Sequence, residues 1–380
     1  MRSGSEGDRR RHHGAGREPV EGRRARRRRL RTRVGRDLGR RHRKASGTAG
    51  VKKLIIQIPC LNEARTLPAT LRDLPRTIPG IDVVEILVID DGSRDATVDV
   101  ARACGADHIV KFRRRKGLAA AFTAGIDTAL KLGADFIVNT DGDNQYAGQD
   151  IPKLLEPLLA GDADIVIGDR NINALEYMSR TRKRLQQLGS WVVRQVSSTQ
   201  VPDTTSGFRA YTREAALRMT IVSEFSYTLE SIIQAGKKRI AITHVPVSTN
   251  PRTRESRLYS GLWDYLKASA ATIVRIYAMY EPLKVFTTIG LLVFAVGVAV
   301  SIRFLYYFFT GTGVVGHVPS LILSAVLMIV GFQVALIGLV ADVISGNRKL
   351  IEDLLYRVRR MERTIEQPSE MLTGSGKGRE

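Results

Sequence analysis

Cysteine is scarce in this sequence of 380 residues, which contains only Cys60 and Cys104. Neither has a second cysteine or a histidine at the spacing of zinc ligands, so the sequence excludes a disulfide framework and a zinc site. We expect both thiols to be small buried groups, which is the usual state of free cysteine.

Large apolar residues are nearly absent from residues 1–50, where 17 Arg and one Lys outnumber five acidic residues. This segment carries +13 of the chain's net charge of +21, and it cannot bury a core, so we predict a disordered tail. It also lacks the apolar stretch of a secretory signal, so the following domain is expected to stay in the cytoplasm. Such a tail is able to bind nucleic acid or anionic lipid. A solvated extension, or a coding sequence that starts at Val34 or Val51, is favoured, and nucleic acid is not an expected partner.

Two long apolar runs, residues 285–308 and 318–344, each have the length needed to cross ~30 Å of hydrocarbon as a helix. Neither has a polar face, which argues against the alternative of a buried helix pair in a soluble protein. The loop at 310–317 has no Lys or Arg, whereas basic residues flank the outer ends: Lys284, Arg348, Lys349, Arg357, Arg359 and Arg360. The positive-inside rule therefore predicts a multi-pass anchor of two helices in the cell membrane, with both termini and the preceding domain in the cytoplasm.

The segments on either side of this hairpin are amphipathic. Within residues 251–284, aromatic and basic side chains alternate with Leu, Ile and Ala, as in helices that lie along the lipid headgroups: Trp263, Tyr265, Lys267, Arg275, Tyr277 and Tyr280. Within the tail at 347–380, apolar residues take the a and d positions of a short heptad pattern: Ile351, Leu354, Val358 and Met361. Two heptads are consistent with a helix that self-associates into a homo-oligomer, and they do not establish it.

Residues 51–250 alternate short β-rich runs with helical ones. The expected strands are 54–59, 85–90, 108–112, 135–140 and 164–169, and the expected helices are 64–74, 97–104, 118–132 and 151–159. This alternation predicts an α/β fold with a mainly parallel sheet covered by helices. Ligands of such sheets bind beyond the carboxyl ends of the strands, so the polar residues that follow each strand are candidates for a site.

Two polar clusters follow the first two expected strands, PCLNE at 59–63 and DDGS at 90–93. Their carboxylates are suited to accept hydrogen bonds from a base or from ribose hydroxyls, and Gly92 permits a tight turn. An ordinary turn and helix cap is the alternative for DDGS.

A third cluster, DGDNQ, follows the fourth expected strand. Asp141, Asp143 and Gln145 are spaced by two, which in an extended segment places all three side chains on one side. Converging oxygen ligands suit Mg²⁺ or Mn²⁺, which leave positions open for phosphate oxygens. A calcium loop of the EF-hand type is excluded because Pro152 stands at its twelfth position, where a glutamate is needed.

Six motifs in order resemble family 2 glycosyltransferases of the GT-A fold. They are PCLNE, VIDDGS, the pair Lys116-Gly117, DGDNQ, GDR at 168–170 and DTTSGFR at 203–209. Their order and spacing are similar to those of polyprenyl-phosphate sugar transferases related to dolichyl-phosphate mannose synthase. The resemblance spans about residues 53–257 and extends in architecture through the two-helix anchor.

The resemblance implies a set of site residues. The nucleotide-diphosphate sugar would be held by Pro59, Asn62, Glu63, Asp90, Asp91, Lys116, Gly117, Arg252, Ser256 and Arg257. The metal would be held by Asp141, Asp143 and Gln145. The acceptor phosphate would be held by Arg170 and by one of Arg182, Lys183 and Arg184, for which a solvated patch is the alternative. Asp141, Asp143 and Arg170 are thus the expected catalytic residues.

Two departures from the family pattern stand in these motifs. Cys60-Leu61 replaces the more usual small-aromatic pair, which leaves the base preference open, and Gly142 occupies the middle of the DxD. The family's QxxRW element of polysaccharide synthases is absent, which favours a polyprenyl-phosphate acceptor, undecaprenyl or dolichyl, and a role in cell envelope glycan synthesis.

The expected reaction is an in-line displacement with inversion, because an anionic phosphate acceptor needs positioning and charge neutralisation rather than a base. One alternative is transfer to a lipid hydroxyl with Asp203 as the base. Another is a non-catalytic, membrane-anchored nucleotide-binding scaffold. We expect Phe208 to pack in the core, and His108 and His244 to be structural.

Overall fold

The computed structural model describes residues 51–171, 180–222, 227–251, 267, 271, 274–275, 277–310 and 318–373. The predicted disordered tail at 1–50 and most of the predicted interfacial segment lie outside these residues. The structural statements that follow concern the described part of the chain.

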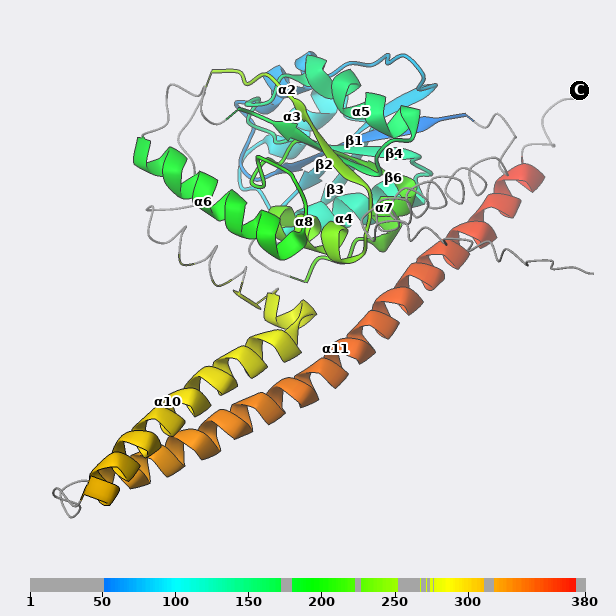
Figure 1. Ribbon diagram of the computed structural model, residues 1–380. Helices are drawn as coiled ribbons and strands as arrows, with labels where there is room; N and C mark the ends of the chain where they lie inside the picture. Colours follow the sequence, from blue (N-terminus) through cyan, green and yellow to red (C-terminus); the bar gives the residue numbers. More distant parts are fainter. Residues whose placement is uncertain are drawn as a thin grey trace, which may run out of the picture. The chain divides into compact units, whose positions relative to one another are not determined.

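The part of the chain before the two long C-terminal helices is built on one mixed sheet of seven strands (Figure 1). The strands are β1 (Lys53–Cys60), β2 (Val83–Asp90), β3 (His108–Lys111), β4 (Phe136–Asn139), β5 (Ile165–Asp169), β6 (Arg209–Thr212) and β7 (Ile242–Pro246). Their order is β3-β2-β1-β4-β6-β5-β7, and only β6 runs antiparallel to its neighbours, β4 and β5. The predicted α/β fold with a mainly parallel sheet is therefore confirmed, and all five expected strands are present.

Helices cover both faces of the sheet (Figure 1). They are α2 (Leu67–Asp73), α3 (Thr97–Ala103), α4 (Leu118–Lys131), α5 (Ile151–Ala160), α6 (Arg180–Ser197), α7 (Arg213–Arg218) and α8 (Tyr227–Lys237), with a 3₁₀ turn η1 (Gly148–Asp150) before α5. Alternate residues of β1 point to opposite faces. Leu54, Ile56 and Ile58 pack with α2 and α5, whereas Ile55 packs with α4, α7 and α8. Both faces of the strand are buried, which explains its continuous apolar run.

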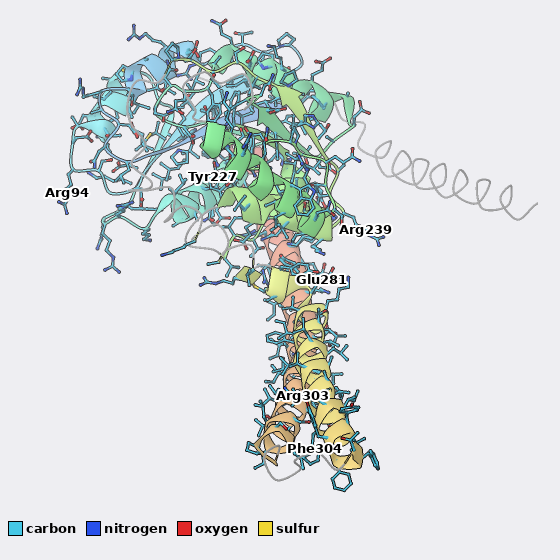
Figure 2. All side chains as sticks on the ribbon, turned by 60° about the vertical axis from the view of Figure 1, so that its left-hand side comes forward. Arg94, Tyr227, Arg239, Glu281, Arg303 and Phe304 are labelled. Carbon is cyan, nitrogen blue, oxygen red and sulfur yellow. The ribbon has the colours of Figure 1, made fainter. Side chains whose placement is uncertain are left out.

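Two long helices, α10 (Pro282–Thr310) and α11 (Val318–Thr373), follow the sheet domain and lie side by side in both views (Figures 1 and 2). Both are long and apolar enough to cross a membrane, and few residues of their apolar windows are buried. That exposure argues against a core helix pair of a soluble protein. Arg303 lies near the end of α10 with its guanidinium carbon 5.9 Å from the ring centre of Tyr307, which suits a cation close to a headgroup layer.

The second helix does not end where the apolar run ends. The apolar run ends at residue 344, but α11 continues without a break through Thr373 and so includes most of the tail at 347–380. Gly346 and Asn347 are tolerated inside it because isolated residues of low helix propensity cost only about 1 kcal/mol or less in a long helix.

Candidate active site

The loops after β1 and β2 are joined by hydrogen bonds at the carboxyl edge of the sheet. The Asn62 amide donates to Ser93 Oγ at 2.8 Å, and the Arg94 amide donates to Asn62 Oδ1 at 2.9 Å. The Glu63 amide donates to Thr97 Oγ1 at 2.9 Å. The structure therefore brings the PCLNE and DDGS clusters together, as expected for strands that are neighbours in the sheet. Pro59 is part of this arrangement as a buried residue of β1.

Asp90 and Asp91, at the carboxyl end of β2, hold two segments, the one that follows β2 and the one that precedes α4. Asp91 Oδ1 accepts from the Lys116 amide at 2.6 Å, and Oδ2 accepts from the Gly117 amide at 2.9 Å. Asp90 accepts from the Ser93 amide at 3.2 Å. A carboxylate at the amino end of α4 is favoured by the helix dipole. The bonds that these two carboxylates make are those of the alternative interpretation of DDGS as an ordinary turn and helix cap. Contact of either carboxylate with a nucleotide stays a prediction.

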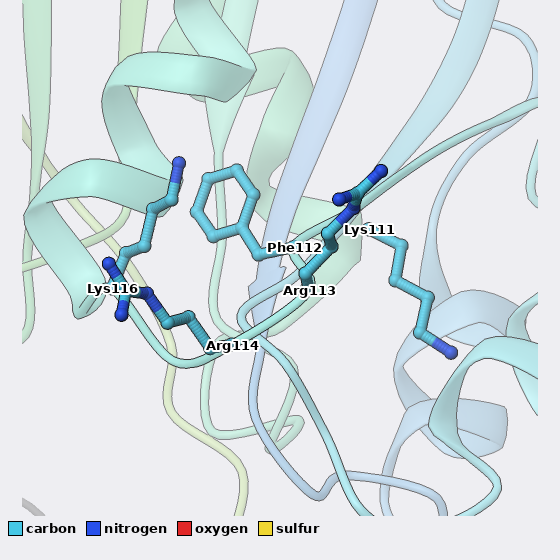
Figure 3. A pocket seen from close by; sticks show the side chains of 5 residues that line it. All are labelled: Lys111, Phe112, Arg113, Arg114 and Lys116. Carbon is cyan, nitrogen blue, oxygen red and sulfur yellow. The ribbon is translucent and has the colours of Figure 1, made fainter.

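A pocket of about 480 Å³ lies at the segment between β3 and α4 (Figure 3). It is lined by Lys111, Phe112, Arg113, Arg114 and Lys116. Lys116 Nζ lies 4.7 Å from the ring centre of Phe112, and the four cations are exposed. Gly92 permits this approach, because its φ is +75° and a Cβ there would lie 2.7 Å from the Arg114 backbone. Clustered cations attract anions, so the pocket raises the local concentration of phosphates next to the site.

The DxD segment is a turn and not an extended strand, so the premise for placing Asp141, Asp143 and Gln145 on one side is wrong. Asn144 has a φ of 57°, and Asp143 Oδ1 accepts from the Gln145 amide at 3.2 Å. A short polar side chain that bonds its own backbone favours such a turn over a strand. All three predicted ligands lie in or next to this turn, and each is partly buried.

Carboxylates from three loops gather around Cys60. Burial raises the pKa of its thiol well above the usual value, and the charges of Glu63, Asp90, Asp141 and Asp143 raise this pKa further. Such a concentration of negative charge at the end of a sheet favours a bound cation.

The turn offers oxygen ligands but not a complete ligand set. No group of three or more His, Cys, Asp or Glu side chains with the arrangement of a metal site occurs among the described residues. Besides the carboxylates of Asp141 and Asp143, the buried Oδ1 of Asn144 accepts no hydrogen bond there. The residues fit Mg²⁺ or Mn²⁺, which bind few protein carboxylates and take further oxygens from a substrate diphosphate.

The two departures from the family pattern meet in space. A Cβ at Gly142 would lie 2.9 Å from Cys60 Sγ, and the Gly142 carbonyl accepts from Thr66 Oγ1 at 3.0 Å and Thr70 Oγ1 at 3.2 Å. Cys60 is buried, as expected, and it fixes how closely the turn approaches β1. The expectation for Cys104 is wrong, because this thiol is exposed after the end of α3.

We expect Gly142→Ala to weaken Mn²⁺ binding about tenfold, ~1.4 kcal/mol, because the methyl group pushes the turn away from Cys60. Adding Cys60→Ala removes the sulfur and should restore most of the affinity, measured by calorimetry on the purified protein. Gly346→Ala is the matched control, since a Cβ there meets no atom within 4 Å. If the double variant binds Mn²⁺ no better than Gly142→Ala, the contact with Cys60 does not set the position of the turn.

A buried polar network connects the DxD turn to the DTTSGFR segment. A Cβ at Gly207 would lie 3.1 Å from Asp141 Oδ1, so the carboxylate lies against this glycine. The Gly207 amide donates to Tyr146 Oη at 2.9 Å, and Asn139 Nδ2 donates to the Gly207 carbonyl at 2.8 Å and to Tyr227 Oη at 2.9 Å. Burial raises the pKa of Tyr146 to about 12, partly opposed by the charge of Arg170. Burial also raises the pKa of Tyr227, so both hydroxyls stay protonated near neutral pH.

Sequence reasoning missed this network. One signal was available in Asn139, a polar residue at the end of the apolar strand β4, and another in Gln57, which interrupts the apolar run of β1. Gln57 Nε2 donates to Asn139 Oδ1 at 2.9 Å, so the two polar residues support each other inside the sheet.

Arg170 and Asp203 form a bidentate ion pair. Arg170 Nε donates to Asp203 Oδ2 at 2.7 Å, and Nη2 donates to Asp203 Oδ1 at 3.0 Å and to Thr205 Oγ1 at 2.9 Å. The Arg170 guanidinium also lies 5.9 Å from the ring centre of Tyr146. Asp203 is fully buried, which raises its pKa, but the charge of Arg170 and the hydrogen bonds outweigh burial and leave that pKa below its usual value. The acid is therefore held as an anion.

The other predicted contacts are only partly described. Lys183 and Arg184 lie in the first turns of α6, whereas the Arg182 side chain, Arg252, Ser256 and Arg257 lie outside the described residues. The chain that leads toward 252 is attached to the DxD turn. The Asn250 amide donates to the Gln145 carbonyl at 2.9 Å, and its Nδ2 donates to the Asn144 carbonyl at 3.1 Å.

Known proteins match both parts of the chain. The family described as glycosyl transferase family 2 matches residues 55–219, and the GtrB C-terminal hairpin matches residues 281–346. The uncharacterized glycosyltransferase Rv0539 of Mycobacterium tuberculosis is 31% identical over 207 residues, which are 54% of this chain and 89% of that protein. Glycosyltransferase AglJ of Haloferax volcanii is 27% identical over 311 residues, 79% of this chain and 97% of that protein. Undecaprenyl-phosphate mannosyltransferase of Micrococcus luteus is 28% identical over 221 residues, which are 55% of this chain and 89% of that protein.

The chain therefore belongs to glycosyltransferase family 2, and its sheet domain has the GT-A-like fold of that family. Its two C-terminal helices, each long and apolar enough to cross a membrane, match the GtrB C-terminal hairpin.

Proposed function

We propose that this glycosyltransferase moves a sugar from a nucleotide-diphosphate sugar to a polyprenyl phosphate, undecaprenyl or dolichyl, with inversion at the anomeric carbon. The observation that carries the proposal is the Arg170–Asp203 ion pair beside the DxD turn. In this pair the Arg170 guanidinium is a fixed cation for an anionic acceptor. The Asp203 carboxylate is poorly suited to act as a base that removes a proton from an acceptor hydroxyl. The names of relatives such as undecaprenyl-phosphate mannosyltransferase support the same acceptor.

The protonation state of Asp203 separates this proposal from transfer to a lipid hydroxyl. A general base must take up a proton near the working pH, but the pKa of Asp203 lies below its ordinary value. Both of its oxygens also accept hydrogen bonds, from Arg170 and from the amides of Thr205 and Ser206. A phosphate monoester needs no such base, because it is already anionic near neutral pH.

The donor would lie across the loops after β1, β2 and β4. Asp141 and Asp143, with Gln145 and Asn144 in the same turn, would hold Mg²⁺ or Mn²⁺. When bound, the metal neutralises the charge that develops on the departing diphosphate. Lys116 in the basic pocket would add a cation on the other side of the donor.

The chain's own residues position the reactants. An oxygen of the acceptor phosphate, oriented by Arg170 and a basic residue of α6, attacks the anomeric carbon as its bond to the diphosphate breaks. The nucleoside diphosphate leaves with both electrons of that bond, and no proton transfer is required. These residues hold the acceptor phosphate and the donor diphosphate in line between fixed cations, and this positioning is their contribution to catalysis.

We place the catalytic domain and both termini on the cytoplasmic side. The basic residues that flank the hairpin, absent from the loop at 310–317, support this orientation by the positive-inside rule. Nucleotide sugars are soluble donors, so a cytoplasmic site gives them direct access, and the product would serve cell envelope glycan synthesis.

The direct test is to incubate the purified full chain in detergent with undecaprenyl phosphate and a panel of nucleotide sugars, and to read the lipid product by mass. We expect one polyprenyl-phosphate-linked monosaccharide, formed only with Mg²⁺ or Mn²⁺. A product on diacylglycerol or ceramide, with none on polyprenyl phosphate, would contradict the acceptor. No turnover with any donor would favour a non-catalytic scaffold.

A further inference from the structure

The part of α11 beyond the predicted membrane span uses one face to hold its own catalytic domain. The apolar run at 318–344 is long enough for ~30 Å of hydrocarbon, and four of the six residues from Arg348 to Asp353 are charged, so this part lies outside the bilayer. Glu352 forms an ion pair with Lys238 at 3.0 Å, and Tyr356 Oη donates to Glu214 Oε1 at 2.8 Å.

One turn further on, Arg359 completes the same attachment. Its Nη1 donates to the Met219 carbonyl at 2.9 Å, and its Nη2 lies 3.3 Å from Asp127 Oδ1. Glu352 and Arg359 are seven residues apart and Tyr356 lies between them, so the three occupy one face of the helix.

The other side of this arm is an exposed apolar stripe, which we call the α11 seam. Its members are Leu350, Ile351, Leu354, Val358 and Met361, and they are 43–65% exposed. Each of them lies about 100° or more around the helix from Glu352, whereas Tyr356 and Arg359 lie within about 40° of it, so the seam and the docked face do not overlap. Exposed apolar residues inside a bilayer need no partner, but five of them in an aqueous segment indicate a buried interface.

The seam has the pattern of a two-stranded coiled coil. With Ile351 at position a, the a positions are Ile351 and Val358, and the d positions are Leu354 and Met361. β-Branched residues at a with Leu at d favour parallel dimers. In this register the docked residues Glu352, Tyr356 and Arg359 fall at b and f, which face outward from a coiled coil.

We propose that the α11 seam pairs with the same seam of a second copy, giving a parallel homodimer that carries one catalytic domain on each outer side. The orientation follows from the anchor, because two copies inserted in one membrane with the same topology point in the same direction. Charge also fits this register. Arg357 at g would face Glu362 of the second copy at e, five positions later, as in parallel coiled coils.

The seam also continues toward the bilayer in the same heptad. Ile337 and Ile344 take earlier a positions, Val340 takes a d position, and all three are exposed on α11. Pairing would therefore extend from the aqueous arm into the span. This inference does not depend on the acceptor or on the metal.

The test is site-specific disulfide formation in native-like membranes, with the exposed Cys104 replaced by serine in the full chain. Leu354→Cys should form a covalent dimer on mild oxidation. Asp353→Cys is the matched control, because it is the adjacent residue and its side chain is 57% exposed, but it lies at c, outside the seam. We expect a covalent dimer of Leu354→Cys and little covalent dimer of Asp353→Cys. Equal crosslinking of both, or none in either, would overturn the proposal.

A second measurement tests register and copy number. The mass of the purified chain in detergent should correspond to two copies, and Arg357→Glu should increase the dissociated fraction at least tenfold by placing acidic residues at facing positions. Adding Glu362→Arg should restore the dimer, with an unchanged thermal transition of the catalytic domain in all variants. A mass of one copy, of three or of four, or an Arg357→Glu variant as dimeric as the parent, would contradict a parallel pair in this register.

Discussion

Asp143→Asn should turn over at least a hundredfold more slowly than the parent, a loss of ~2.7 kcal/mol or more in transition-state stabilisation. The substitution keeps the size of the side chain but removes the negative charge that a hard divalent cation prefers. Asp143 Oδ1 also accepts from the Gln145 amide at 3.2 Å, and the asparagine oxygen can keep this bond, so the turn and the fold should be little changed. Turnover and Mn²⁺ and Mg²⁺ titrations on purified protein measure the effect.

A matched substitution at the other edge of the sheet provides the control. Asp82 is exposed before β2, where its carboxylate accepts from the Lys52 amide at 2.7 Å, far along the strand from the DxD turn. Asp82→Asn should retain turnover and metal dependence. If Asp143→Asn behaves like Asp82→Asn, Asp143 is only a turn residue, and the chemical support for metal-assisted transfer is lost.

The catalytic fold could be predicted from the sequence because its signals are local. The strands at β1, β2, β4 and β5 are short apolar runs, each followed by a helix, and that alternation is sufficient for a parallel sheet. The antiparallel strand β6 was not predicted. Its four residues begin at Arg209, the last residue of the DTTSGFR motif, and its direction depends on pairing with β4 and β5, which are distant in sequence.

The site was predictable as a list of residues and less so as a set of contacts. Arg170 and Asp203 are 33 positions apart, and nothing in either motif indicates that they form an ion pair. Arg209 illustrates the same limit. It is fully buried and donates to the carbonyls of Thr204, Ser206 and Thr228, so the last residue of a site motif serves to hold the loop rather than a ligand.

Arg170→Ala should lower transfer to polyprenyl phosphate at least a hundredfold, ~2.7 kcal/mol, while donor binding stays near the parent value. The structure adds a second consequence. Asp203 is fully buried and would lose the cation that compensates its charge, which typically costs about 3–5 kcal/mol of stability. A drop in activity alone would therefore not separate loss of the acceptor contact from partial unfolding.

Two further variants make that separation. Arg170→Lys keeps a positive charge near Asp203 but loses the planar fork, so stability should largely return while acceptor use stays reduced. The double change Arg170→Ala with Asp203→Asn removes both charges, so the thermal transition should recover relative to Arg170→Ala, without recovery of transfer. These variants are compared by thermal melting, by calorimetric titration of the donor, and by kcat and KM for the acceptor.

Arg213→Ala is the control for the loss of a partly buried ion pair elsewhere. Arg213 Nη2 lies 2.9 Å from Asp135 Oδ1 at the amino end of β4, the opposite edge from the DxD turn. This variant should lose stability and keep the parent's KM for polyprenyl phosphate. If the double variant at Arg170 and Asp203 regains both stability and transfer, Arg170 acts only as the counter-ion of Asp203. The acceptor phosphate must then be held by other cations, and Lys183 and Arg184 on α6 are the remaining predicted candidates among the described side chains.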